Sequence, residues 1–264
     1  MSAPLPPPAL ALHDVVKRFG THTAIDCVSL DIAAGTFVSI VGPSGCGKST
    51  LLNVIAGLLP MSSGRVEVFG EPLTGINRRA TYMFQQDALL PWKTVLGNVQ
   101  FGLTLRGTNG AAAVARAQSW LDRVGLKGCG DLYPHQLSGG MRKRVALAQC
   151  WIMQPDLILM DEPFSALDVH TRLRMESEIL DLWSGSGTTV VFVTHDLEEA
   201  IALSDQVFLL SAGPASRLVG RYAVDLPRPR HLIDIKGDAH FHGVYRTIWN
   251  DLRQEVLDSY DRTR

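Results

Sequence analysis

The chain has 264 residues, of which 46% are hydrophobic and 19% charged, so it can bury the core of one large domain or two small ones. Its 25 basic and 26 acidic residues leave a net charge of -1, which argues against a surface that coats nucleic acid or anionic lipid. The four cysteines form no CxxC pair, which favours a reducing compartment over a disulfide framework or a zinc site.

The first residues, MSAPLPPPAL, predict no regular structure. They lack the basic start and the long apolar core of a secretion signal, and no run of about eighteen apolar residues occurs in the chain. We therefore expect neither secretion nor a membrane-spanning segment. Because proline disfavours a regular helix, residues 1–9 are predicted to be a disordered leader.

Short runs rich in β-branched and aromatic residues alternate with helical patterns along the chain. Several runs are apolar on both faces, as in strands covered by helices on each side. The pattern predicts an α/β fold with a largely parallel central sheet. The predicted strands span residues 37–42, 64–70, 80–85, 157–161, 188–195 and 206–211.

The phosphate-loop pattern GxxxxGK[ST] is matched by GPSGCGKST, residues 42–50, between a predicted strand and a predicted helix. Its glycines let backbone N–H groups point inward, and the helix N-terminus adds positive potential. Lys48 is expected to reach the β and γ phosphates, and Ser49 to ligate magnesium. A glycine-rich turn without a ligand is the alternative. The predicted nucleotide-binding residues of the loop are Gly42, Pro43, Ser44, Gly45, Cys46, Gly47, Lys48, Ser49 and Thr50.

Helical periodicity replaces the strand pattern between residues 86 and 155, which predicts an inserted helical subdomain. One helix of this subdomain is expected to bury an apolar stripe. The stripe consists of Val114, Ala117, Trp120, Leu121 and Val124.

The stretch HQLSGGMRKRVALAQ, residues 135–149, places a serine and two glycines before a predicted helix, as an anion site would. A helix N-terminus contributes about 0.3 to 1 kcal/mol to anion binding, or ~2 kcal/mol when buried. Even millimolar binding needs about 4 kcal/mol. The stretch is therefore too weak to bind a nucleotide alone, but Ser138 and nearby amides could contact a γ phosphate that is held elsewhere.

The three basic residues of this stretch, Arg142, Lys143 and Arg144, are expected to form a solvated face. They fall short of the roughly 6 to 10 phosphate contacts of a useful nucleic-acid surface, so no nucleic-acid partner is expected. The buried stripe of the helix is predicted to be Met141, Val145, Ala148 and Ile152.

Two acids end the apolar strand in LILMDEP, at the edge of a parallel sheet where ligands bind. Asp161 is expected to hold magnesium, and Glu162 to orient the attacking water. The alternative is that the acids cap a helix, which would leave the phosphate loop without a metal partner. Gln85 and His195 end two other predicted strands, and neither residue alone would indicate a functional site.

Apolar residues return at helical spacing after DLPRPR, residues 225–230, which proline keeps extended or turn-like. Residues 226–264 are therefore predicted to be an extension whose amphipathic helix packs on the body, with a partner-binding face as the alternative. The apolar positions are Phe241, Val244, Tyr245, Ile248, Trp249, Leu252 and Val256.

With these motifs in this order, residues 10–225 resemble the ATP-binding subunit of an ABC transporter. The resemblance implies a P-loop NTPase of the ABC type: a mostly parallel core sheet, an antiparallel β-subdomain and the inserted helical subdomain. It implies ATP and Mg²⁺ as ligands, and two chains that face each other head to tail around two ATP molecules.

The resemblance also assigns roles to individual residues. Phe19 would stack on adenine, and Gln85 would ligate magnesium and sense the membrane subunits. The implied catalytic residues are Glu162, His195, Lys48 and Gln85; the implied metal ligands are Ser49, Gln85 and Asp161. The signature motif LSGGM would contribute Ser138, Gly139 and Gly140, and the SALD turn Asp168.

Two positions depart from the family pattern. Met141 stands where the signature usually has glutamine, and Gln149 where ALAR has arginine. The first change leaves the phosphate contacts of Ser138 and the amides in place. The second puts a local ion pair or packing contact in doubt, and not the ATP site.

The subgroup that imports nitrate, sulfonates, taurine and similar small solutes is most similar, on the cues FQQDALLPWKTVLGNVQFGL, the methionine-containing signature and DLPRPR. The implied partners are a second ATP-binding subunit, transmembrane permease subunits and, indirectly, a solute-binding protein, with the chain at the cytoplasmic face of the membrane. The loop ALLPWKTV is expected either to dock on the permease or to place Trp92 in the core of the helical subdomain. A soluble ABC protein of translation or DNA repair and an unrelated P-loop kinase are the alternatives.

Overall fold

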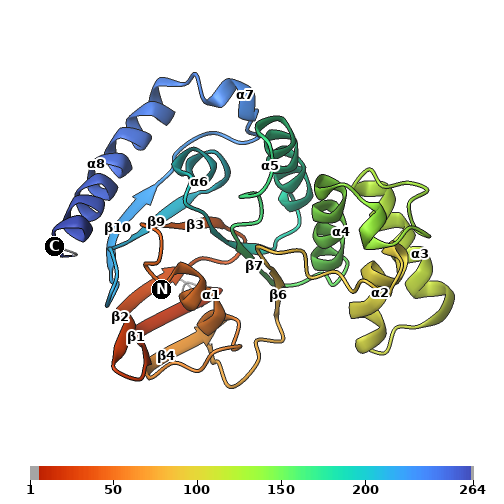
Figure 1. The fold of residues 1–264 in the computed structure, drawn as a ribbon, viewed down its shortest axis with the longest axis horizontal. Coiled ribbons are helices and arrows are strands. Elements are labelled where there is room, and N and C mark those ends of the chain that lie inside the picture. The colour runs from red at the N-terminus through yellow and green to blue at the C-terminus, as the bar shows by residue number, and fades with distance from the viewer. Residues whose placement is uncertain (1–5, 263–264) are drawn as a thin grey trace, which may run out of the picture.

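Two β-sheets and the helices around them make up the structure, a computed structural model that describes residues 6–262 (Figure 1). The larger sheet is parallel except for β10, which pairs antiparallel with β9 at one edge. In spatial order its strands are β10 (Leu218–Ala223), β9 (Gln206–Leu210), β3 (Phe37–Val41), β8 (Thr189–Val193), β7 (Leu157–Asp161) and β6 (Ala80–Met83).

The smaller sheet is antiparallel and is formed mainly by the N-terminal part of the chain. Its order is β2 (His22–Ile32), β1 (Leu10–Phe19), β4 (Ser63–Val68) and β5 (Glu71–Pro72). All six strands predicted from apolar runs are present, and the predicted α/β class with an antiparallel subdomain is confirmed. The pattern did not single out β1, because register shifts between Leu12 and Arg18 interrupt its alternation of apolar and polar residues.

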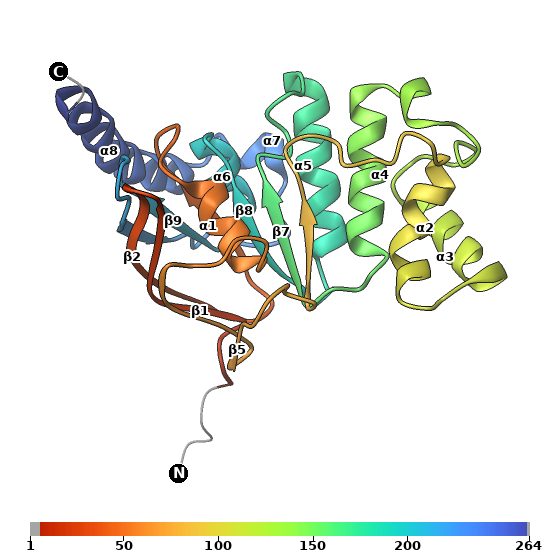
Figure 2. The ribbon, with the colours of Figure 1, turned by 60° about the horizontal axis from the view of Figure 1, so that its bottom comes forward.

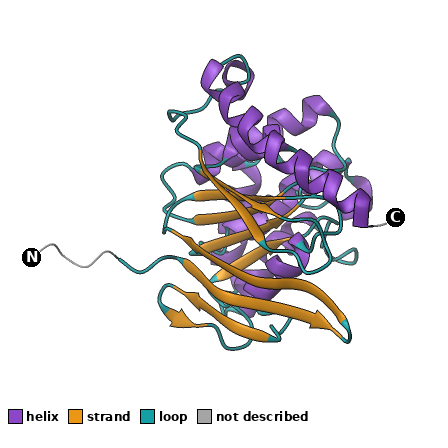
Figure 3. Cartoon of the chain, turned by 90° about the vertical axis from the view of Figure 1, so that its left-hand side faces the viewer, coloured by secondary structure: helices purple, strands orange, loops and turns teal. Residues whose placement is uncertain are grey.

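The two faces of the central sheet bury different layers, because side chains alternate along each strand. Val38, Ile40 and Leu159 face a core shared with the antiparallel sheet and with α1 (Lys48–Ile55), which lies between the two sheets (Figure 2). Phe37 and Phe192 face the opposite core. Figure 3 shows that helices form the layer over this second face. They are α5 (Val169–Trp183), α6 (Leu197–Leu203), α7 (Leu232–Ile235) and α8 (Ala239–Arg262).

All regular elements between β6 and β7 are helical, and the three α-helices among them share a third core. They are α2 (Val95–Leu105), α3 (Gly110–Arg123), the 3₁₀ helix η1 (Pro134–Gln136) and α4 (Gly139–Trp151). α4 lies next to α5 and connects this group to the sheet (Figure 1). The predicted stripe of α3 was wrong at Val114, which is 42% exposed, whereas its neighbour Ala113 is buried. The helix presents the smaller alanine to α2 and turns the bulkier valine outward.

The basic residues of α4 do not form the solvated face that the sequence predicted. Lys143 is buried; its ammonium donates to the carbonyl oxygen of Gln85 at 2.7 Å and lies 3.1 Å from Asp87. Arg142 bonds the same aspartate at 2.9 Å, and Arg144 pairs with Glu178. These cations connect α4 to the segment after β6 and to α5, so they stabilise contacts within the protein.

The C-terminal segment is fixed to the body by Arg230, which is buried and donates to the backbone carbonyls of Ser204, at the end of α6, and of Leu226, after β10. Burial lowers the pKa of Arg230 to about 10. From α8, Phe241 and Ile248 are buried, but Trp249 is 46% exposed and was wrongly placed on the packing face. No helix in the described residues is long and apolar enough to span a bilayer.

The N-terminal leader was predicted for residues 1–9, and residues 1–5 lie outside the described residues. Ala9 is buried, and its carbonyl oxygen accepts a hydrogen bond from the backbone N–H of Phe69 at 3.0 Å.

Candidate functional site

The loop between β3 and α1 forms a cradle of backbone groups. Gly45 and Gly47 have φ values of +76° and +90°, and a Cβ on Gly47 would lie 2.8 Å from the Ile25 side chain of β2. Glycine is required at position 47 for both reasons. Lys48 begins the helix and is buried, and its ammonium donates to the carbonyl oxygens of Gly42 at 2.9 Å and Pro43 at 3.1 Å.

A cavity of about 310 Å³ opens at this loop. Its walls combine the loop and the start of α1 with the carboxylate of Glu162 from a different part of the chain. The lining residues are Ser44, Gly45, Gly47, Lys48, Ser49, Thr50 and Glu162. Because the N-terminus of α1 and an ammonium group face it, this cavity suits a phosphate group. Cys46, also predicted there, is buried in the core beneath.

Asp161, the last residue of β7, reaches the same loop. Its Oδ1 accepts a hydrogen bond from the Ser49 hydroxyl at 2.9 Å, and its Oδ2 accepts one from the Tyr82 hydroxyl at 3.3 Å. Burial raises the pKa of Asp161, and these two hydrogen bonds act in the opposite direction. The structure therefore brings together the predicted metal ligands Ser49 and Asp161. Tyr82 was missed by sequence reasoning; its place one residue before the end of β6 was the available signal.

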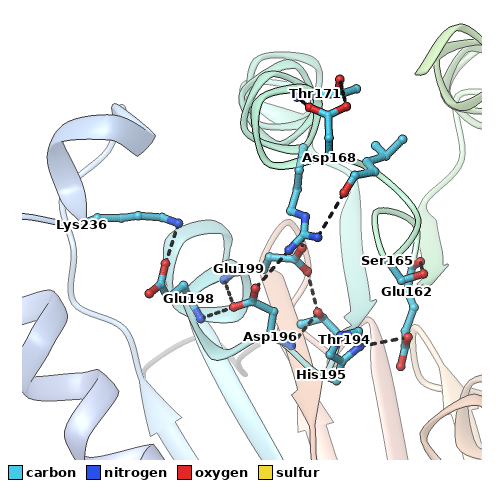
Figure 4. A network of polar contacts seen from close by, with 12 residues as sticks. Glu162, Ser165, Asp168, Thr171, Thr194, His195, Asp196, Glu198, Glu199 and Lys236 are labelled. Atoms are coloured by element: carbon cyan, nitrogen blue, oxygen red, sulfur yellow. Dashed lines mark hydrogen bonds and ion pairs between the residues drawn. The ribbon is translucent and has the colours of Figure 1, made fainter. Parts of the chain in front are cut away.

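The next residue, Glu162, turns away from the strand and toward His195. Glu162 has a φ of +41°, which is unusual for a residue with a Cβ. Its N–H donates to the carbonyl oxygen of Val193 in β8, and its Oε2 lies 3.1 Å from Nδ1 of His195 (Figure 4). Two of the four predicted catalytic residues are thus in contact at the ends of neighbouring strands.

Gln85 and Phe19 lie on other segments near the ends of strands. Gln85 follows β6, which ends at Met83, and its amide donates weakly to the Ser165 hydroxyl at 3.5 Å. Phe19 is the last residue of β1; its ring is 47% exposed and lies 4.8 Å from the ammonium of Lys17. An exposed ring at a strand end is free to stack on a flat ligand.

The predicted signature residues lie in a second cavity, of about 580 Å³, which shares no lining residue with the first. Ser138 caps α4, its hydroxyl oxygen accepting from the N–H of Met141 at 3.3 Å, and Asp168 caps α5 by accepting from the N–H of Thr171 at 3.0 Å. That N–H group lowers the pKa of Asp168. Ser138, Gly139, Gly140 and Asp168 therefore face one space, and the phosphate loop faces another.

Comparison with known proteins agrees with this arrangement. The family model "ABC transporter" matches residues 25–165. The aliphatic sulfonates import ATP-binding protein SsuB of Burkholderia ambifaria is 47% identical over 228 residues, which cover 86% of this chain and 68% of that protein. The nitrate import ATP-binding protein NrtC of Synechococcus elongatus is 40% identical over 238 residues, 89% of this chain and 36% of that protein.

Among solved structures, a dimeric ATP-binding cassette in a post-hydrolysis state with ADP and Pi matches with a TM-score of 0.72 and 32% identity, covering 83% of this chain and 100% of that one. The family match covers more than half of the chain, and the phosphate loop, the paired acids and the histidine lie together in space. The chain belongs to the ABC transporter family, as an ATP-binding and ATP-hydrolysing subunit.

Proposed function

We propose that this chain energises an importer of small anionic or zwitterionic solutes of the nitrate, sulfonate or taurine kind. The observation that carries ATP hydrolysis is the convergence of the Ser49–Asp161 and Glu162–His195 contacts at one phosphate-sized cavity. The solute class rests on relatives whose names specify import of sulfonates and of nitrate. Importers of another solute class are the alternative.

The residues around the phosphate loop fit a nucleotide with its magnesium ion. Mg²⁺ in nucleotide sites takes one or two protein oxygens, with phosphates and waters completing its shell. Ser49 and Asp161 supply such a pair, and no cluster of three or more His, Cys, Asp and Glu side chains able to hold a metal occurs in the described part of the chain. The ion would neutralise charge on the β and γ phosphates. Gln85 is proposed as a further ligand, and Phe19 as the ring that stacks on adenine.

In this proposal Glu162 and His195 act on the water that attacks the γ phosphate. A carboxylate and an imidazole in contact at 3.1 Å can orient a water and stabilise charge that develops beside it, which is most of what phosphoryl transfer asks of side chains. Lys48 would leave its carbonyl acceptors, Gly42 and Pro43, for phosphate oxygens. The exchange keeps the buried ammonium paired, because one set of oxygen acceptors replaces another.

The second cavity is proposed to receive the nucleotide of another copy of the chain. This cavity has no phosphate-binding loop of its own, and a helix N-terminus alone is too weak to hold ATP. The groups that it offers are Ser138, the amides of Gly139 and Gly140, and Asp168. Two chains arranged head to tail would bring each phosphate loop against the other chain's signature residues, and the dimeric state of a solved relative supports the pairing of two copies. Each ATP would then be enclosed by two subunits.

We further propose that the chain binds transmembrane permease subunits at the cytoplasmic face of the membrane, with a solute-binding protein on the other side. Trp92 is 72% exposed, so the expectation that it fills the core of the helical subdomain is wrong, and the docking alternative remains. Exposed apolar side chains in a loop favour a contact with a partner. Gln85, seven residues earlier on the same segment, would connect such a contact to the nucleotide.

Substitution of Glu162 by Gln tests the proposed site. Steady-state ATP hydrolysis by the purified chain should fall by about 10²-fold or more, because the amide cannot accept a proton or polarise water. ATP binding should persist, and with ATP the variant should elute as a dimer in size exclusion. Glu71→Gln, an exposed residue of β5, is the matched control. Wild-type turnover, or monomeric elution with ATP, would contradict the proposal.

The solute is tested in the cell. A strain that lacks this chain should fail to grow on an aliphatic sulfonate as sole sulfur source or on nitrate as sole nitrogen source, and the intact gene should restore growth while Glu162→Gln should not. Unchanged growth on both would exclude these solutes and favour another class.

A further inference from the structure

A partly buried arginine of α5, Arg172, contacts one residue in the turn before its own helix and two residues at the start of α6. Its Nη2 donates to the carbonyl oxygen of Leu167 at 3.2 Å, and its Nη1 to Asp196 Oδ2 at 3.3 Å. Its Nε lies 3.5 Å from Glu199 Oε1. One guanidinium thus connects the turn before α5 to the first turns of α6.

The two acids that contact Arg172 also fix the backbone around His195, because Glu199 bonds the residue before it and Asp196 is the residue after it. Thr194 is buried, and its hydroxyl donates to Glu199 Oε2 at 2.6 Å while accepting from the N–H of Asp196 at 3.0 Å. Asp196 Oδ1 in turn caps α6 by accepting from the N–H groups of Glu198 and Glu199. His195 itself is 56% exposed, so its neighbours, more than its own packing, fix where its backbone lies.

The other contact of Arg172 leads to the second cavity. Leu167 directly precedes Asp168, and both line that cavity together with Ser138, Gly139 and Gly140. The phosphate-loop cavity is lined by Glu162, which His195 contacts. Arg172 therefore lies between a turn that lines the second cavity and the loop that carries His195, whose ring contacts a lining residue of the phosphate-loop cavity.

The charges around Arg172 fit a role in holding this cluster. Glu176 and Glu199 are both buried, and burial raises the pKa of each. Arg172 lowers both pKa values, as Lys236 does for Glu176 and His195 for Glu199, whereas Asp196 raises both. Arginine suits the position because its donors are held on three nitrogen atoms of one planar group, whereas the donors of a lysine ammonium share a single nitrogen on a flexible stem.

We propose that Arg172 is a positioning residue that holds the His195 loop in register with the Leu167–Asp168 turn, so that a change at the second cavity moves His195 relative to Glu162. The inference rests on the proposed roles of Glu162 and His195. In a head-to-tail dimer, Arg172 would connect the nucleotide enclosed at one site to the catalytic pair of the other. A simple stabilising ion pair between α5 and α6 is the competing explanation.

The test is a set of substitutions in the full chain, measured by ATP hydrolysis. Arg172→Ala should lower kcat by about tenfold, since a displacement of a catalytic group by a fraction of an ångström has effects of this order. The KM for ATP should stay within about twofold, because Arg172 does not line the phosphate-loop cavity. Arg65→Ala is the matched control: this arginine of β4 is 59% exposed, pairs with Glu67 at 3.0 Å and lines neither cavity. It should leave both constants unchanged.

Two further variants separate positioning from stability. Arg172→Lys keeps the charge but should not restore kcat, because the donors of an ammonium all diverge from one nitrogen and do not reach acceptors spread around a guanidinium. Full recovery would overturn the inference, even if Arg172→Ala fails to fold. In a His195→Ala background, adding Arg172→Ala should cost almost no further activity. Losses that multiply in the double variant would show that Arg172 acts independently of His195, and would also overturn it.

Failure of the inference is distinct from failure of the proposed function. If Glu162→Gln and His195→Ala both hydrolyse ATP at the wild-type rate, the proposed site is wrong. If both are impaired while Arg172→Ala behaves as wild type, only the positioning role of Arg172 is wrong.

Discussion

At the scale of single residues, the proposed catalytic residue Glu162 has a strained backbone. Glu162 has a left-handed backbone, which costs on the order of 1 kcal/mol for a residue with a Cβ. Two hydrogen bonds hold it there: its N–H donates to Val193, and its carbonyl oxygen accepts from the Ser165 hydroxyl at 3.0 Å. Glycine would relax the backbone but would remove the carboxylate that faces the phosphate loop. The left-handed backbone is therefore best explained by its effect on the side chain, because it directs the Glu162 carboxylate toward the phosphate loop.

Glu176 gives a pH dependence to stability that substitution should remove. Burial raises the pKa of this carboxyl from 4.5 to about 7, with Glu199 and Asp196 adding to the shift and Lys236 and Arg172 opposing it. A group whose folded pKa is raised contributes stability that is present below pH 4.5 and is lost as pH rises through 7. The folded protein then holds an unfavourable buried charge.

We therefore expect Glu176→Gln to stabilise the protein above pH 7 by on the order of 1 to 3 kcal/mol, and to change its stability little near pH 5. Urea unfolding of both proteins across this range measures the difference. Glu71→Gln, on the exposed edge strand β5, controls for loss of a negative charge. An equal effect of Glu176→Gln at pH 5 and pH 8 would contradict the assignment of the raised pKa.

At the scale of elements, α4 and the segment after β6 behave as one unit. Lys143 bonds Gln85 and Asp87, and Arg142 bonds Asp87 as well, so the helix that carries Ser138 is connected to the residue proposed to sense the permease. Gln149 of the same helix donates to the carbonyl oxygen of Asn98 at 3.2 Å, where the family pattern has arginine. This bond connects α4 to α2, and it answers the doubt that the departure raised about local packing.

Lys143→Met tests this connection. The apolar side chain keeps the volume but leaves the carbonyl oxygen of Gln85 without this donor, so the free energy of unfolding should fall by about 1 to 3 kcal/mol. Lys127→Met, at an exposed position, should change it by less than about 0.5 kcal/mol. Denaturant titration with the slope m compared between variants is the measurement. Equal small effects at the two positions would show that the buried contacts of Lys143 contribute nothing.

The contacts of Lys143 also show where prediction from sequence stops. The strands and the phosphate loop were predicted because each signal is local: an apolar run, or glycines at fixed spacing. Lys143 was expected to be solvated because its partners lie about sixty residues earlier in the chain, at Gln85 and Asp87. Tyr82 and Arg172 were missed for the same reason. Their roles depend on which strand ends meet, and periodicity does not contain that information.

At the scale of the whole molecule, one chain presents two incomplete halves of a site. The phosphate loop and Glu162 line one cavity, with Asp161 and His195 bonded to residues of that lining. Ser138 and its neighbours line another cavity, and the two have no residue in common. A dimer related by a two-fold axis makes the contact reciprocal: each copy would contribute a loop to one site and a signature helix to the other. Hydrolysis would then require two chains, although each chain contains every catalytic residue type.

Mixing two inactive variants tests this reciprocity. Lys48→Ala removes the phosphate-binding ammonium, and Ser138→Arg blocks the signature helix, so each homodimer should be inactive. A mixed dimer has one site with both defects and one site with neither, because the loop of the Ser138→Arg chain faces the signature of the Lys48→Ala chain. If one intact site suffices, an equal mixture should recover about a quarter of the wild-type rate, since about half of the dimers are mixed and each carries one intact site of two.

The mixing ratio supplies the control. Recovery should be greatest at equal amounts and should fall toward zero when either variant is in large excess, a dependence that a contaminating ATPase would not show. A chain that hydrolysed ATP alone would not regain activity at any ratio, because no single polypeptide in the mixture is intact. If the two variants still bind each other in size exclusion but every mixture hydrolyses ATP only at the background rate, the model of two independent sites at the dimer interface is wrong. A maximum of ATPase activity at equal amounts of the two variants would therefore show that the phosphate loop of one chain is completed by Ser138 of another chain.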